Sequence, residues 1–321
     1  LSGFLVPLSA FKENQRNVLL NWGKRYLRLM PMVVIGCMMG WLVMKAGLVY
    51  SLKMVDITYA KNYTEWFNNF EPGKLMGKDG PLYDGMIGSF LDRSLYNAPL
   101  GTIKFIWINS LILLILNKFC SKLKTRYIIY SILICLSYMS GRLQYENFYF
   151  GIMLLGMLLC DVFYNPLSSA KRLHVPMGII CMIAGVYLVS VPKGSPSNGI
   201  YSWIVTLPIT HYLYWAIGWS FIVIAIESVS GIRKFLENRV FLWLGDVSFA
   251  IFAVHWPVVV SVSCAFLLGL FKINGMSYAG ACCLVVIVTI AIVIGVSWIV
   301  QNKIYKYLCK FVNRIVEKLE K

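Results

Sequence analysis

Charge is scarce in this sequence. Asp, Glu, Lys and Arg together make up 14% of its 321 residues, whereas a soluble globular domain carries about 25%. Hydrophobic residues make up 59% and are gathered in long runs. Too few charged side chains remain to cover a water-exposed surface of this size. The composition therefore excludes an ordinary soluble protein and predicts an integral membrane protein.

Patterns that hold metals or disulfides are also missing. The nine cysteines include no C-x-x-C pair, and none falls in a loop expected outside the membrane. We therefore expect no disulfide framework and no metal site. The motifs of P-loop nucleotide-binding proteins, α/β-hydrolases and zinc proteases do not occur either. The sequence thus gives no indication of these common enzyme classes.

Eight runs are long and apolar enough to cross a bilayer, which takes about 20 helical residues. Because hydrocarbon offers no partner to backbone N–H and C=O groups, each run has to be a helix. We therefore expect an all-α, polytopic membrane helix bundle with about eight transmembrane helices, of which the third is short. The runs are 31–50, 99–117, 127–140, 147–164, 175–192, 209–228, 241–268 and 278–300.

The net charge of +16 does not indicate a nucleic-acid partner, because the basic residues alternate with the spans. Twenty of the 30 lie on one side, eight lie on the other, and two lie inside spans. The basic side of a membrane protein is cytoplasmic. We therefore expect a multi-pass protein of the bacterial cytoplasmic membrane, with both Leu1 and Lys321 inside and an external loop at about 51–98. The tail 301–321 is typical of a basic amphipathic helix that lies on anionic membrane lipids.

Three segments carry motifs that are informative together. They are Leu1–Leu5 (LSGFL), Arg25–Pro31 (RYLRLMP) and Leu244–Pro257 (LGDVSFAIFAVHWP). In this order and on this hydropathy profile they resemble FFxLSGFLI, R-x-x-R-[IL]-x-P and LGxxSYxxYLxHxP, three motifs of the acyltransferase-3 family of integral membrane acyltransferases. Asn97–Lys104 (NAPLGTIK) is similar to a degraded form of that family's NxPLWTLxxE segment.

The resemblance implies that residues 1–300 are a membrane acyltransferase domain preceded by two further helices, about ten in the complete protein. It implies a main catalytic base, a histidine, upstream of Leu1. The donor would be an acyl-CoA with acetyl as the expected group, a substrate and not a bound cofactor. The acceptor would be a hydroxyl of a surface glycan or lipid-linked sugar. Gly101 stands at the family's Trp and Ile106 at its Glu. We therefore expect this chain to insert and pack but to be inactive alone.

Arg25 and Arg28 are the candidate donor-binding residues. They stand three apart at the start of a span, so they share one face of a helix, and two guanidinium groups there suit the phosphates of coenzyme A. Ordinary positive-inside charge is the alternative reading. His255 lies roughly 20 Å along its span at about 1.5 Å per residue, a depth at which ionisable groups are rare. His255 has two alternative roles: it is a supporting proton acceptor, or it is a structural histidine hydrogen-bonded between helices.

Other polar residues are weaker candidates. Lys45 and Lys104 are expected to snorkel to an interface. Asp161 and Glu227 lie near inner ends of their spans, where water can reach them, and His211 lies near an outer end. The external loop is rich in aromatic rings, which either stack on sugars or form an interfacial belt.

Two other functions remain open at this point. A transporter or flippase of lipid-linked sugars also needs many helices and buried polar groups, but the sequence shows neither internal repeats nor matched broken helices. A non-catalytic membrane homologue would fit the loss of a carboxylate at Ile106.

Reporter fusions test the expected orientation. Because most basic residues gather on one side, a reporter after Lys321 should be active in the cytoplasm and one inserted in the loop 51–98 should be active outside. Paired alkaline phosphatase and β-galactosidase activities measure this. Activity on the same side at both positions would show that the number of spans between them is wrong.

Overall fold

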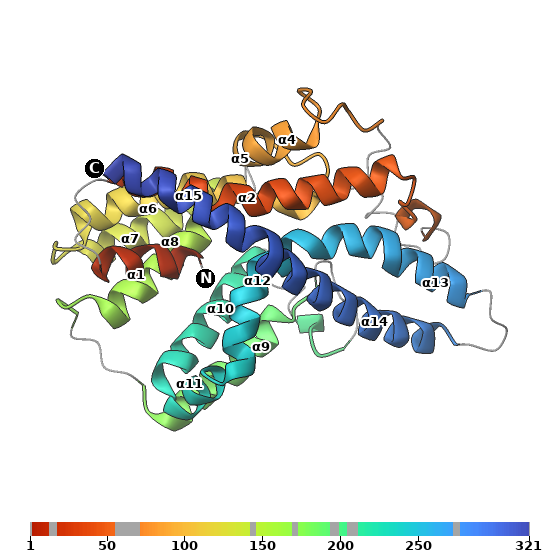
Figure 1. Cartoon of the computed structure of the whole chain (residues 1–321). Helices are drawn as coiled ribbons and strands as arrows, with labels where there is room; N and C mark the ends of the chain where they lie inside the picture. Colours follow the sequence, from red (N-terminus) through yellow and green to blue (C-terminus); the bar gives the residue numbers. More distant parts are fainter. Residues whose placement is uncertain are drawn as a thin grey trace. The chain divides into compact units, whose positions relative to one another are not determined.

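The computed structural model describes residues 2–12, 18–54, 71–141, 146–168, 173–192, 199–203, 211–271 and 277–320. Within these ranges the chain is helical and contains no β-strand (Figure 1). The expected all-α class is therefore confirmed. Helices satisfy their own backbone groups, which is what an apolar chain of this kind requires.

Among the described residues, five helical stretches are long and apolar enough to cross a membrane, as an integral membrane protein requires. A sixth exists if α10 (His211–Ser228) and α11 (Ser230–Leu236), which meet at 98°, form one broken span. Several of these stretches continue through short π-helical turns. The five are Val18–Lys45, Ala98–Cys120, Asn147–Tyr164, Arg239–Leu270 and Tyr278–Val312.

Two of the eight expected spans are helices that are short for a crossing. α7 (Arg126–Gly141) has 16 residues and α9 (Val175–Val189) has 15. At about 1.5 Å per residue they extend roughly 22–24 Å, less than the hydrocarbon thickness of about 30 Å. The structure thus supports five or six spans, and the number eight stays a prediction.

The chain divides into two compact units. The first consists of Leu1–Trp22 and Ile108–Leu242. In it, α1 (Ser2–Lys12) and α7 pack on α8 (Glu146–Tyr164), and α10 packs on α8 and α9. Its largest core cluster is formed by aliphatic, sulfur-containing and aromatic side chains from α1 and from α6 to α8: Val6, Leu113, Leu114, Cys120, Tyr130, Met153, Leu154 and Met157.

The second unit consists of Gly23–Trp107 and Trp243–Lys321. Its core joins α2, the segment around Phe90 and Leu100, α12 and α14. The elements of this unit, including helices shared with the first, are α2 (Val18–Lys45), η1 (Ser51–Met54), α4 (Pro81–Tyr83), η3 (Asp84–Gly88), α5 (Ser89–Leu91), η4 (Ala98–Thr102), α6 (Ile103–Cys120), α12 (Arg239–Val258), η6 (Val259–Ser263), α13 (Cys264–Leu270), α14 (Tyr278–Ile299), η7 (Val300–Tyr305) and α15 (Lys306–Glu320).

The segment 71–97 folds back along α2. At one end the indole of Trp41 donates to the carbonyl of Gly73 (2.8 Å), and at the other the hydroxyl of Tyr26 donates to the carbonyl of Met86 (2.7 Å). Trp41 and Tyr26 are 15 residues apart on α2, roughly 22 Å along the helix axis. The described part of the expected external loop therefore lies beside the apolar length of a candidate span. We call residues 71–97 the α2 hairpin.

Glycines allow the α2 hairpin to approach the helix this closely. A Cβ atom added at Gly40 would collide with the carbonyl oxygen of Tyr96, and one at Gly85 would lie 2.6 Å from the Cα atom of Val34. Both neighbours are backbone atoms, so no side-chain movement could make room. Backbone therefore packs directly on backbone at two levels of α2.

Replacing Gly40 by Ala tests this contact. The added methyl group overpacks the site, and such changes destabilise by about 1–3 kcal/mol, so we expect a lower melting temperature in detergent. Gly295→Ala is the matched control, because Gly295 lies in helix α14 with no atom within 4 Å of its added Cβ. That control should be neutral or slightly stabilising. Equal melting temperatures for the two variants would contradict the packing described.

Candidate functional site

Asn97 joins three helical elements of the second unit. Its side chain is fully buried, and its amide nitrogen donates to the carbonyl of Ala253 on α12 (2.7 Å) and to that of Gly36 on α2 (3.3 Å). Asn97 itself directly precedes η4 and α6. Helix α2, which contains Arg25–Pro31, thus meets the segments Asn97–Lys104 and Leu244–Pro257 at one side chain, which we call the Asn97 junction.

Arg25 and Arg28 lie on one turn of α2, which we call the arginine turn and which contacts from neighbouring residues hold in place. Between them, Tyr26 bonds the α2 hairpin and packs its ring against Phe90 and Trp107, with ring centroids 4.8 and 5.5 Å away. The hydroxyl of Tyr305 donates to the carbonyl of Arg28 (2.9 Å). Arg28 is exposed and Arg25 is half-buried. The positions of both arginines are therefore held by contacts of neighbouring groups, while their own side chains stay available.

Neither Arg25 nor Arg28 forms an ion pair with the residues that the structure describes, and the Nε atom of Arg25 is shielded there without a hydrogen-bond partner. A shielded guanidinium without a counter-charge is costly, because desolvation of its charge is not offset. An incoming anion would offset that cost. Donor-phosphate binding and ordinary positive-inside charge therefore both stay open for the two arginines.

Two other arginines, in the first unit, are already neutralised. Nε of Arg126 lies 2.8 Å from Oδ1 of Asp161, with both side chains buried, and Nη2 of Arg233 lies 3.0 Å from Oε2 of Glu227. The hydroxyl of Tyr164 donates to the other Glu227 oxygen (2.8 Å). The expectation that water reaches Asp161 and Glu227 is wrong, because each carboxylate is buried against its own arginine.

His255 is half-buried on α12, and its Nδ1 atom lies 2.8 Å from the carbonyl oxygen of Phe252 and 3.1 Å from that of Ile251. Carbonyl oxygens only accept, so in the neutral ring Nδ1 carries the hydrogen. The lone pair is then on Nε2. The local geometry thus prepares His255 to accept a proton, as a supporting base must.

The structure places His255 and the arginine pair in one unit but at different levels. His255 comes two residues after Ala253, which shares the Asn97 junction with Gly36. Arg28 lies eight residues before Gly36, roughly 12 Å along α2. The two candidates therefore do not form one contact site, and a single ligand reaching both has to be elongated.

Asp84 is a buried carboxylate that the sequence analysis did not single out. Its Oδ2 atom accepts from the backbone N–H groups of Leu95 (3.0 Å) and Tyr96 (3.2 Å) and from the hydroxyl of Ser94 (3.2 Å). These bonds close the turn of the α2 hairpin. Burial raises the pKa of Asp84, although the two backbone N–H groups act in the opposite direction. The sequence Tyr83-Asp84-Gly85 looks like an ordinary exposed turn, so only the fold reveals this role.

The remaining candidates have modest environments. Ile106 packs against the core of the second unit, and Gly101 has its nearest neighbour 3.6 Å from an added Cβ. The ammonium groups of Lys45 and Lys104 lie over the rings of Trp41 and Phe105. The side chain of His211 and the aromatic residues between 55 and 70 lie outside the described residues.

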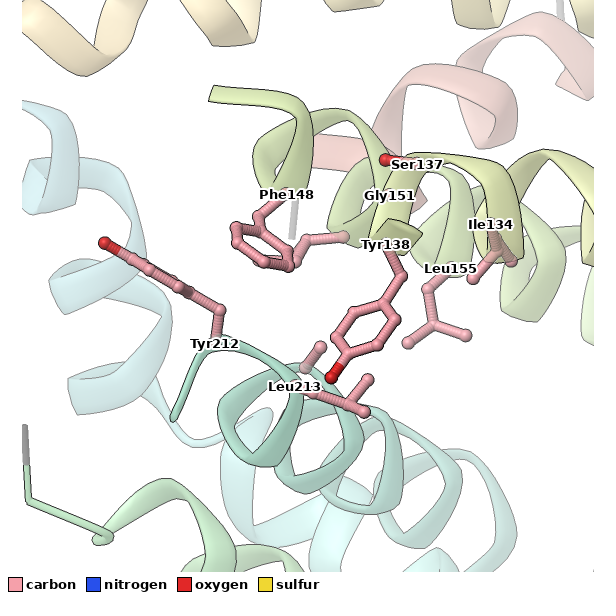
Figure 2. Close-up of a pocket in the computed structure, with 10 residues that line it drawn as sticks. Ile134, Ser137, Tyr138, Phe148, Gly151, Leu155, Tyr212 and Leu213 are labelled. Atoms are coloured by element: carbon pink, nitrogen blue, oxygen red, sulfur yellow. The ribbon is translucent and has the colours of Figure 1, made fainter. Parts of the chain in front are cut away.

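A small pocket in the first unit is almost purely apolar. It has a volume of about 40 Å³ between α7, α8 and α10. Figure 2 shows Tyr138 extending toward Leu213, and the rings of Phe148 and Tyr212 stack with centroids 5.2 Å apart. Ser137 already donates its hydroxyl hydrogen to the carbonyl of Asn147. The pocket offers packing for an apolar group and no group that would perform chemistry.

No family model, curated protein or solved structure matches this chain. The resemblance to acyltransferase-3 proteins therefore rests on the motif residues themselves and on where the structure puts them.

The pH dependence of stability tests the buried carboxyl of Asp84. Because its folded-state pKa is raised, its contribution to stability is fully present below the unfolded pKa of about 3.9 and is lost as pH rises through the folded pKa. Asn has no proton to lose. The melting temperature of Asp84→Asn relative to the unchanged protein should therefore be higher at about pH 8 than at about pH 5.

The control for Asp84 is Asp92→Asn, at an exposed aspartate of the same hairpin, which removes a charge without altering the buried site. A relative melting temperature of Asp84→Asn that stays constant, or that rises on acidification, would show that burial does not raise the pKa of this carboxyl.

Proposed function

We propose that this chain is a membrane O-acyltransferase that moves an acyl group, expected to be acetyl, from cytoplasmic acyl-CoA to a hydroxyl of a cell-surface glycan or lipid-linked sugar. The observation that carries the proposal is the Asn97 junction. Two of the three segments that resemble acyltransferase-3 motifs, Arg25–Pro31 and Leu244–Pro257, and the similar segment Asn97–Lys104 are far apart in the sequence, yet their helices meet at one buried amide. Independent chance resemblances would have no reason to converge.

The reaction has simple requirements. The acceptor hydroxyl oxygen attacks the thioester carbonyl carbon, a C–O bond forms, and the C–S bond to coenzyme A breaks. The hydroxyl proton goes to a base, and the thiolate leaving group takes up a proton. Such a base contributes typically about 10²–10⁴-fold. His255, with Nε2 free to accept, is the candidate in this chain for a supporting base.

An elongated donor molecule fits the separation between the arginine pair, Arg25 and Arg28, and His255. Coenzyme A carries phosphates at one end and the reacting thioester at the other, joined by a long flexible arm. Arg25 and Arg28 would hold the phosphates, and the roughly 12 Å of α2 between Arg28 and the Asn97 junction would be spanned by that arm. The proposal includes eight spans in this chain, both ends in the cytoplasm, and Arg25 and Arg28 at the inner surface where acyl-CoA is present.

A transporter of lipid-linked sugars is the second candidate. It is favoured by the 98° bend between α10 and α11, because broken helices often form substrate sites in transporters. The two candidates differ in a direct measurement. A transferase moves labelled acetyl from acetyl-CoA onto the glycan, whereas a transporter moves the sugar lipid across vesicles without using acyl-CoA.

Replacing Arg28 by Lys tests the donor site. A lysine keeps the charge but loses the two-pronged guanidinium geometry, so we expect acyl-CoA binding to weaken by about 10-fold, which equals roughly 1.4 kcal/mol. Isothermal titration of the protein in nanodiscs measures this. Arg239→Lys, at an exposed arginine of α12, is the control and should bind as before. Unchanged binding by Arg28→Lys at normal protein levels would return Arg28 to a topological role.

A further inference from the structure

The surface at the junction between η7 and α15 contains an open hollow of mixed polar and apolar lining that the motifs do not account for. It has a volume of about 370 Å³ and is lined by residues of the tail, among them Gln301, Asn302, Tyr305, Lys306 and Lys310. Ligand sites in proteins typically measure about 300–1,000 Å³. The hollow is therefore large enough for a small polar group, and none of its lining residues is acidic.

Lys306 and Lys310 place two positive charges on one wall of the hollow. They are four residues apart on a helix, so their side chains lie one above the other. The ammonium of Lys306 donates to Oδ1 of Asn302 (2.7 Å), and that of Lys310 lies over the ring of Tyr307, 5.7 Å from its centroid. Like charges at this spacing repel. Their neighbours orient both groups without neutralising either.

The hollow adjoins the arginine turn of α2. Tyr305 lines the hollow, and its hydroxyl donates to the carbonyl of Arg28. The exposed Arg28 side chain thus starts from the backbone that Tyr305 holds. Two lysines line the space, Arg28 lies on the turn of α2 that Tyr305 contacts, and no lining residue is acidic. The described residues of this unit contain no ion pair for these three cations.

The π-helical turn explains why a hollow exists here. In η7 (Val300–Tyr305) the wider turn interrupts an otherwise continuous helix. Such turns are rare in proteins, and those that occur are often found at functional sites. The Oε1 atom of Gln301 is shielded in this turn without a hydrogen-bond partner among the described residues. The wider turn and the unsatisfied side-chain oxygen set η7 apart from the helices on either side of it.

We propose that this hollow binds a phosphate group, held by Lys306 and Lys310 from α15 and by Arg28 from α2. The phosphate has two possible sources with the same chemistry: the acyl-CoA donor or the headgroup of an anionic lipid. Binding of the donor's phosphate rests on the proposed function, and binding of the lipid's phosphate does not. Charge-assisted hydrogen bonds from ammonium and guanidinium groups to phosphate oxygens are among the strong ones in proteins.

The test uses the whole chain in nanodiscs with the double variant Lys306→Gln and Lys310→Gln. Its matched control is Lys122→Gln with Lys124→Gln, which removes two exposed charges between α6 and α7. In phosphatidylcholine nanodiscs, titration with coenzyme A measures the first source. Native mass spectrometry of protein purified with mixed phosphatidylglycerol and phosphatidylcholine counts retained anionic lipid and measures the second.

For the donor source we expect the tail variant to bind coenzyme A about 10-fold more weakly, while the control changes less than about 2-fold. For the lipid source we expect the tail variant to lose the retained phosphatidylglycerol, whereas the control variant should keep this lipid. If coenzyme A binds none of the proteins but lipid retention still depends on the two lysines, the hollow is a phosphate site and the proposed function fails. If the tail variant matches the control in both measurements, the phosphate site does not exist.

Discussion

A backbone N–H group at hydrocarbon depth must find its acceptor within the protein, because lipid offers none. Helices meet this requirement along most of the described chain. The α2 hairpin is irregular and cannot meet it alone. Asp84 accepts from two of its backbone N–H groups, and the Asn97 amide ties its end to carbonyls of α2 and α12. The hairpin can therefore lie against a candidate span, and the arginine turn of α2 is braced as a result.

Arginine has two distinct uses in this protein. Arg126 and Arg233 are each matched with a buried carboxylate, so their charges stabilise the first unit and are not available to a ligand. Arg25 and Arg28 have no such partner among the described residues and stand beside a basic hollow. Local pairing, and not the number of basic residues, therefore decides where an anion can bind.

The sequence predicts the helices well and the hairpin poorly, for physical reasons. Hydropathy locates α12, with His255 on it, because the helix follows from an unbroken apolar run. It misses the α2 hairpin because that segment is rich in Gly, Asp and Lys and looks like a loop. It misplaces Asp161 because the neutralising Arg126 is 35 residues away in the chain. The Arg25 and Arg28 pair was predictable from spacing, whereas the basic hollow needs the π-helical turn and its contact with α2.

The Asn97 junction also has a consequence for biogenesis. Its acceptor on α12 is 156 residues further along the chain, which at about 5–20 residues per second takes roughly 8–30 s to synthesise. Until α12 emerges, the amide of Asn97 lacks its shorter hydrogen bond and the α2 hairpin lacks its closing contact. The second unit is built from two separate stretches, Gly23–Trp107 and Trp243–Lys321, so it is complete only after the second stretch has been synthesised. During that interval the nascent protein exposes a polar, incomplete surface that membrane quality control could recognise.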